Sequence, residues 1–150
     1  MLVVERAVAE VTSVRLYGDR RATYLVTVAL GAEFGSYSGA LTRLAEVRQG
    51  HLHWVQERDV HMEQDTELRL LSSLKTAWRL LRRRDGRGQE ILLVACRPDV
   101  SALVDTSRGQ QFPLIFVRYR FGDGRWRRYE RTEPGCWESG DAFPERLRFP

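Results

Sequence analysis

Residues 114–132, LIFVRYRFGDGRWRRYERT, carry the strongest fold signal in the chain, a β-hairpin whose register follows from the residue pattern. A tight type I′ turn at Asp123-Gly124 suits residues that tolerate positive φ. A three-residue Gly-Asp-Gly loop would mix arginines with the aromatic residues, whereas the two-residue turn separates them. The resulting pairs are Gly122 with Arg125, Phe121 with Trp126, Arg120 with Arg127, Tyr119 with Arg128 and Arg118 with Tyr129.

Because side chains alternate along a strand, this hairpin has two chemically different faces. The apolar face contains Val117, Tyr119, Phe121 and Trp126. The basic face contains Arg118, Arg120, Arg127 and Tyr129. We expect the first face to lie in the core and the second to meet water, where it could bind an anionic partner.

Size and composition indicate one globular domain over residues 1–150, with 133–150 as an irregular tail. Of the residues, 43% are hydrophobic and 29% charged, which is typical of folded proteins. The N-terminus meets Glu5 and Arg6 too early for a signal peptide. No apolar run approaches the ~20 residues of a membrane helix. These features predict a soluble, cytoplasmic protein without a membrane partner.

The basic residues are concentrated in the middle of the chain. The net charge is +4 overall, but residues 68–131 hold 15 basic and 6 acidic residues. Lys75 is the only lysine, so almost all basic residues are arginine. A GC-rich genome explains such a ratio, and arginine is also the better side chain for bidentate binding of phosphate or carboxylate.

Three further segments are typical of strands. Residues 8–17 and 23–30 alternate in polarity around a turn and predict a first hairpin. Residues 90–96, EILLVAC, predict a strand buried on both sides. Residues 99–106 are compatible with a helical turn or a strand.

Two segments show helical spacing. Residues 40–50, ALTRLAEVRQG, predict a short helix that Ser38 can cap. Residues 65–84, DTELRLLSSLKTAWRLLRRR, predict a longer one with leucines on one arc and arginines outside it, among them Arg79, Arg82 and Arg83. The expected fold is α+β, a mostly antiparallel sheet with two helices on one face. A partly closed β-barrel with helices is the alternative.

The cysteines and histidines offer weak site signals. Cys96 and Cys136 fix neither a disulfide framework nor a zinc site, and Cys96 reads as a small buried residue. His51, His53 and His61 lie close in sequence, with Glu63 as a possible fourth ligand. They could hold zinc, and a metal-dependent enzyme would be built there. A half-exposed strand with solvent-facing histidines is the competing interpretation, and we expect no cofactor.

Trp137, Phe143 and Phe149 recur in the irregular tail. Such aromatics usually pin a tail to its own domain, and docking on a partner is the alternative.

No catalytic motif or family signature stands out. The basic residues favour a non-catalytic module that binds nucleic acid or an acidic protein surface through Arg118, Arg120, Arg127, Tyr129, Arg79, Arg82 and Arg83. A structural or adaptor subunit of a homo- or hetero-oligomer is the second hypothesis, and an enzyme is the third.

Overall fold

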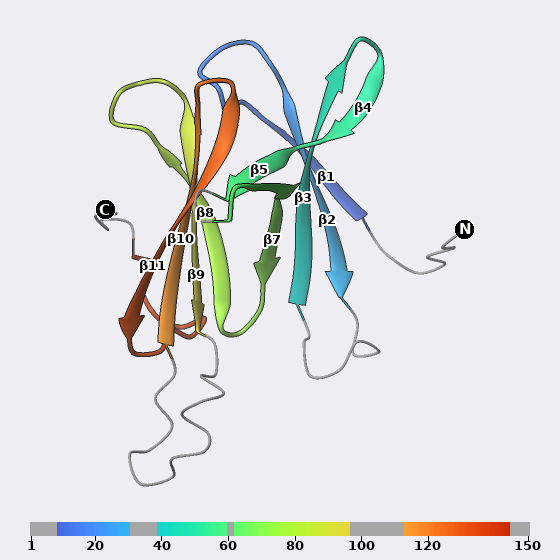
Figure 1. Cartoon of the computed structure of the whole chain (residues 1–150). Helices are drawn as coiled ribbons and strands as arrows, with labels where there is room; N and C mark the ends of the chain where they lie inside the picture. Colours follow the sequence, from blue (N-terminus) through green and yellow to red (C-terminus); the bar gives the residue numbers. More distant parts are fainter. Residues whose placement is uncertain (1–8, 31–38, 60–61, 97–112, 145–150) are drawn as a thin grey trace, which may run out of the picture.

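The computed structural model describes residues 9–30, 39–59, 62–96 and 113–144, and every regular element in these ranges is a β-strand. The first sheet contains β1 (Ala9–Val14), β2 (Thr23–Leu30), β3 (Gly39–Arg48), β4 (His51–Trp54) and β7 (Arg69–Ser72), in the order β1-β2-β3-β4 with β7 paired to β3. The second sheet has the order β6 (Gln64–Glu67), β5 (Gln56–Asp59), β11 (Arg125–Pro134), β10 (Pro113–Gly122), β9 (Gln89–Cys96) and β8 (Thr76–Arg82). Among these described strands, β5 and β11 form the one parallel pair (Figure 1).

The central hairpin has the register that its sequence predicts. β10 and β11 pair Gly122 with Arg125, Phe121 with Trp126 and so on through every expected pair. Asp123 and Gly124 have φ angles of 52° and 79°, as a type I′ turn requires. The pairing of β1 with β2 and the burial of Ile91–Cys96 in β9 are also confirmed.

Neither expected helix exists, so the α+β class is wrong. Residues 40–50 fall in β3 and its turn, and residues 65–84 fold as β6, β7, β8 and their connections. The barrel alternative is wrong too, because the described strands pair into two separate sheets. The region 99–106 lies outside the described residues.

The leucines of residues 65–84 explain why a helix was the wrong interpretation. Leu70 is fully buried, while its neighbour Leu71 is 47% exposed, although one helical arc would bury both. Leu68 and Leu70 point inward with the two-residue period of a strand. Leucine and arginine are good helix formers, but strand pairing with distant segments overrides that preference.

Two buried residues carry the chain from one sheet to the other. Val55 separates β4 from β5, and Leu68 separates β6 from β7. The Val55 amide donates to the Leu44 carbonyl (2.8 Å) and the Leu68 amide to the Val55 carbonyl (3.0 Å). These bonds join the sheets at a shared corner inside the core.

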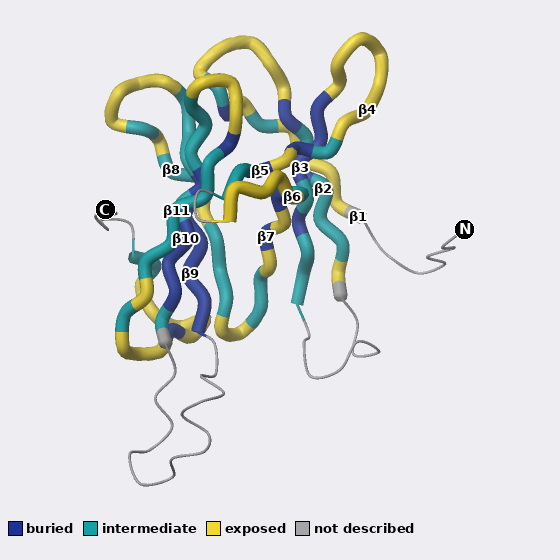
Figure 2. Tube along the Cα trace, in the orientation of Figure 1, coloured by how far each residue is buried: buried dark blue, intermediate teal, exposed yellow. Residues whose placement is uncertain are grey.

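The main core lies between the sheets. Its largest side chains come from β3, β7, β9, β10 and β11 and include Leu44, Leu70, Ile91, Tyr119 and Trp126. Figure 2 shows the buried stretches along β9 and β10. The apolar face predicted for the hairpin therefore does lie in the core.

A smaller cluster covers the other side of the second sheet. Trp137 of the tail packs on Val94 and Phe116, and a disulfide joins Cys96 to Cys136 with a Cα–Cα distance of 5.2 Å. Cys96 is buried as expected, but it is disulfide-bonded and not a free thiol. The disulfide fixes the start of the tail to the end of β9.

The described residues contain no helix that is long and apolar enough to cross a membrane.

Candidate polyanion-binding face and neighbouring pocket

Three arginines lie abreast on the outer face of the second sheet, on three neighbouring strands. Arg58 of β5 pairs with Arg127 of β11, and Arg127 pairs with Arg120 of β10. We call these three residues the arginine row. Like charges directly opposite on neighbouring strands destabilise a sheet, so this row is an unfavourable arrangement that other groups must offset.

Each member of the row has a carboxylate neighbour. Arg58 lies 3.5 Å from Asp65, and Arg127 lies 2.9 Å from Asp123. Arg120 lies 3.2 Å from Glu90. The three arginine side chains are still 31–38% exposed, so solvent screens the attraction and each pair stabilises the fold only weakly.

A second row lies beside the first. Arg118 pairs with Tyr129 on one side and with Leu92 on the other, and Leu92 pairs with Arg79. The guanidinium carbon of Arg118 lies 5.1 Å from the centre of the Tyr129 ring, a cation–π contact. Burial lowers the pKa of Arg118 from its usual range, Glu90 opposes that effect, and Arg120 adds to it.

Arg82, expected to share a face with Arg79, does not. In a helix, residues three and four apart lie together, whereas along β8 Arg79 and Arg82 point to opposite sides. Arg83 donates to the Phe121 carbonyl (2.7 Å) and pairs with Asp85, so it connects the β8–β9 turn to β10. Both the Phe121 carbonyl and the Asp85 carboxylate therefore hold the Arg83 guanidinium in place.

Two of the tail aromatics, Trp137 and Phe143, pack on the second sheet beside Arg79. Trp137 is buried in its own domain, and Phe143 packs against it beneath the guanidinium of Arg79 (4.7 Å to the ring centre). Phe149 lies outside the described residues. Two of the three proposed docking residues are thus used within the chain.

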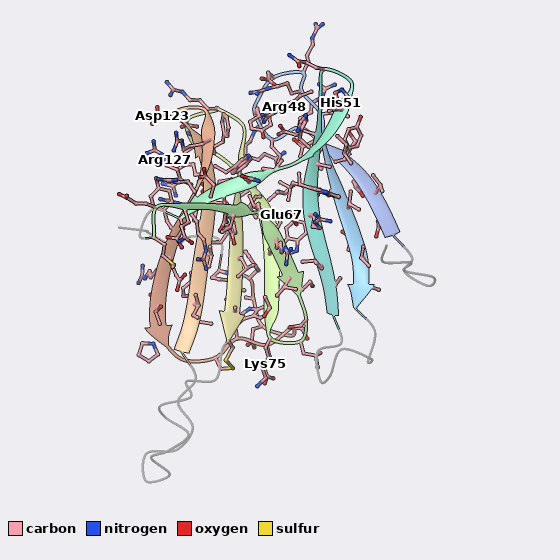
Figure 3. The ribbon with its side chains drawn as sticks, turned by 45° about the vertical axis from the view of Figure 1, so that its right-hand side comes forward. Arg48, His51, Glu67, Lys75, Asp123 and Arg127 are labelled. Atoms are coloured by element: carbon pink, nitrogen blue, oxygen red, sulfur yellow. A yellow bond between two sulfur atoms is a disulfide. The ribbon has the colours of Figure 1, made fainter. Side chains whose placement is uncertain are left out.

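The histidines do not form a metal centre in the part of the chain that the structure describes. His51 and His53 share one side of β4, as predicted, and both are exposed (Figure 3 labels His51). His61 lies outside the described residues. Among the residues that are described, no three His, Cys, Asp or Glu side chains are placed to hold an ion.

A pocket of about 410 Å³ opens beside the β3–β4 and β10–β11 hairpins, and we call it the hairpin pocket. Its charged lining residues include Arg48, Arg58, Asp65 and Arg125, and the His53 ring lies among them. Its inner lining includes Glu46, Val55, Glu57 and Trp126, all buried, with Trp54 and Phe121 beside them. Arg58 belongs to both the pocket and the arginine row, so the two features are continuous.

Glu46 is a buried carboxylate with several donors. It accepts a hydrogen bond from the Tyr17 hydroxyl and another from Arg48 (2.8 Å). The Trp126 indole N–H donates to the Tyr17 oxygen (3.0 Å). Burial and the bond to Glu46 raise the pKa of Tyr17 well above its ordinary value. Tyr17 therefore remains a neutral donor.

Glu57 is a buried carboxyl group with fewer partners. Thr66 donates to Oε1 (3.2 Å), but Oε2 is buried and has no hydrogen-bond partner among the described residues. Arg128 lies 4.0 Å from Oε1 and closer to Asp59 and Glu130. Burial raises the pKa of Glu57 to about 7, whereas Arg128 and hydrogen bonds with Thr66 and Tyr119 oppose the shift.

Sequence reasoning missed Glu46, Glu57 and Arg58. No local signal marks them, because their placement depends on long-range pairing of β3 and β5. A carboxylate at an inward position of a strand is recognisable only once the strand is assigned.

The comparisons decide nothing further. No family model, no curated protein and no solved structure matches this chain.

Proposed function

We propose that this chain is a non-catalytic binding module that holds a nucleic-acid strand on the outer face of its second sheet. The observation that supports this function is the arginine row, with Arg118 and Arg79 in the row beside it. Guanidinium groups at neighbouring strand positions offer a line of bidentate donors, and phosphate oxygens along a backbone are their natural acceptors.

The arginine row and the row beside it contain five arginines, Arg58, Arg79, Arg118, Arg120 and Arg127, and the carboxylates next to the arginine row are Asp65, Glu90 and Asp123. These eight side chains carry a net charge of about +2, and Arg125, on the same side of β11 as Arg127, adds one more positive charge to the face. Because half-exposed ion pairs are weak, phosphates can replace the carboxylates at little cost.

Salt dependence tests the proposal. We expect a short single strand to bind with an affinity that falls steeply with salt, at about 0.7 log units per log unit of salt for each neutralised phosphate. The triple variant Arg118→Gln, Arg120→Gln, Arg127→Gln should reduce that slope by about 2. Titration by fluorescence anisotropy at several salt concentrations measures both.

The matched control removes the same charge from elsewhere. Arg15, Arg20 and Arg69 are exposed and lie in the first sheet or its β1–β2 turn, whereas the arginine row lies on the second sheet. Their triple replacement by glutamine should leave most of the slope intact. An equal loss in the two variants would mean that net charge, and not this face, attracts the strand. Competition by polyglutamate as effective as by oligonucleotide would indicate an acidic protein partner instead.

A second candidate function, a subunit of a protein assembly, has its own supporting observation. The outer face of the first sheet carries apolar cross-strand pairs, Val11 with Val26 and Leu41 with Leu71. Val11 and Leu71 are 61% and 47% exposed, and exposed apolar patches commonly mark interaction sites. Light scattering after size exclusion, with Val11→Lys as the dissociating variant, tests this candidate.

We also propose a cytoplasmic location, and the disulfide provides its test. Disulfides persist in oxidising compartments and are rare in the cytoplasm. Rapid alkylation of freshly lysed cells should find Cys96 and Cys136 free if the chain works in the cytoplasm. Cysteines that resist alkylation until reductant is added would place it elsewhere.

A further inference from the structure

The hairpin pocket changes in character from its rim to its floor. Arg48 and Arg125 at the rim are exposed, whereas Trp126 and Glu57 at the floor are 2% and 7% exposed. The rim thus presents guanidinium groups to solvent. The floor contains an indole ring and a carboxyl group that are shielded from solvent. A pocket of a few hundred Å³ with this mixture is of a size to bind a small planar group.

The rim continues into the arginine row. Arg58 lines the pocket and pairs with Arg127 in the row. Arg125 also lines the pocket and lies two residues before Arg127 on β11, on the same side of the strand. A strand bound along the row would therefore pass the mouth of the pocket, where Figure 3 shows Asp123 and Arg48 at the same end of the molecule.

The two buried carboxylates of the pocket, Glu46 and Glu57, differ in their hydrogen-bond partners. Glu46 has Tyr17 and Arg48 as donors. Glu57 has a buried Oε2 with no hydrogen-bond partner among the described residues, and the loss of such a bond typically destabilises a protein. A ligand that brings N–H donors to Glu57 would supply the missing bond.

We propose that the hairpin pocket receives one unstacked guanine base from the strand bound on the arginine row. This inference depends on the proposed function and adds a base preference to it. Guanine presents N1–H and its N2 amino group side by side, which matches the two oxygens of a carboxylate; uracil offers a single N–H donor there. The base ring would pack against Trp54, and the phosphates of that nucleotide would reach Arg58 and Arg125.

The experiment compares two short labelled strands on the full chain at low salt, an oligouridine and the same strand with one central guanosine. We expect the guanosine strand to bind about tenfold more tightly, which is at the lower end of what one bidentate base contact contributes. In Glu57→Gln the preference should disappear, because the amide places a donor against a donor. The oligouridine affinity and its salt dependence should not change.

The matched control is Glu130→Gln, which also removes a carboxylate beside Arg128 (2.9 Å) but does not line the pocket. It should keep the tenfold preference. On the unmodified chain, free guanosine monophosphate should displace the guanosine strand and uridine monophosphate should not, which tests the pocket even if Glu57→Gln does not fold.

The outcomes separate the two proposals. Equal affinity for both strands, or a preference that survives in Glu57→Gln, overturns the base pocket and leaves the arginine row as a sequence-independent site. If neither strand binds at low salt, both the pocket and the proposed function are wrong.

Discussion

Glu57 is buried beside Arg128, but the attraction of Arg128 only partly offsets the cost of burying the ionised carboxylate. Arg128 divides its attraction among Glu57, Asp59 and Glu130, and it lies farthest from Glu57. The ionised form of Glu57 is therefore poorly stabilised, which agrees with a pKa raised to about 7.

The Glu57 carboxyl group should make stability depend on pH. In the unfolded chain it releases its proton near pH 4.5, whereas in the folded protein it keeps it until about pH 7. The stabilisation from the protonated Glu57 is fully present below pH 4.5 and is lost as the pH rises to 7. The free energy of unfolding should fall over this range by about 3 kcal/mol. Urea melts of Glu57→Gln should show a flatter profile over this range and a gain at pH 8. Glu10→Gln, an exposed change on β1, should keep the original profile.

Gly88 should be irreplaceable for a reason that is local to its backbone. Its φ is 102°, and an added Cβ would lie 2.2 Å from the Leu16 carbonyl oxygen. We expect Gly88→Ala to destabilise the fold by roughly 3 kcal/mol or more. Gly86→Ala, with φ of 71° and open space around it, should cost only about 1 kcal/mol. Similar losses in the two variants would contradict the close contact.

Among the elements, the β10–β11 hairpin was predictable because its information is local. Turn chemistry at Asp123-Gly124 and the alternation of rings and arginines fix the register within 19 residues of sequence. The arginines at 118, 120 and 127 could be placed on one face for the same reason. Arg58 joins that face only through the parallel pairing of β5 with β11, which no local pattern announces.

Residues 65–84 show the opposite case. Their leucine spacing fits a helix, and the turn at Ser73–Lys75 contains no glycine or proline to mark it. Residues 65–84 form strands because β7 pairs with β3 and β8 pairs with β9. Both pairings involve segments outside residues 65–84. Glu46 was missed for the same reason, because it lies in residues 40–50, which were also expected to form a helix and instead form β3.

Paired substitutions in β7 distinguish the strand from the helix. Leu70 is fully buried and Leu71 is 47% exposed, so Leu71→Glu should cost less than about 1 kcal/mol while Leu70→Glu should prevent stable folding. A helix would bury both on one arc and make both changes severe. Denaturant melts followed by tryptophan fluorescence measure the difference.

On the scale of the whole molecule, the chain is held together by its crossings between sheets and by one covalent link. Val55 and Leu68 tie the sheets at the corner, so neither sheet is contiguous in sequence. We expect the described sheets to unfold in a single transition, because strands of each depend on segments of the other.

The disulfide should contribute measurably to that transition. It spans 40 residues, and loop-closure entropy predicts about 4 kcal/mol of stabilisation for a link of that length. Cys136→Ser should lower the free energy of unfolding by an amount of this order, and dithiothreitol should then have no further effect. If reductant destabilised the variant as much as the parent, the link between Cys96 and Cys136 would not be its target.

The same link has a consequence for a severed chain. A protease site engineered between residues 97 and 112 would cut inside the loop that Cys96 and Cys136 close. The nicked protein would still migrate as one molecule on a denaturing gel and would fall into two fragments only after its sulfur–sulfur bond was opened. One covalent bond would then keep the strand carrying Arg120 attached to a molecule that no longer has a continuous backbone.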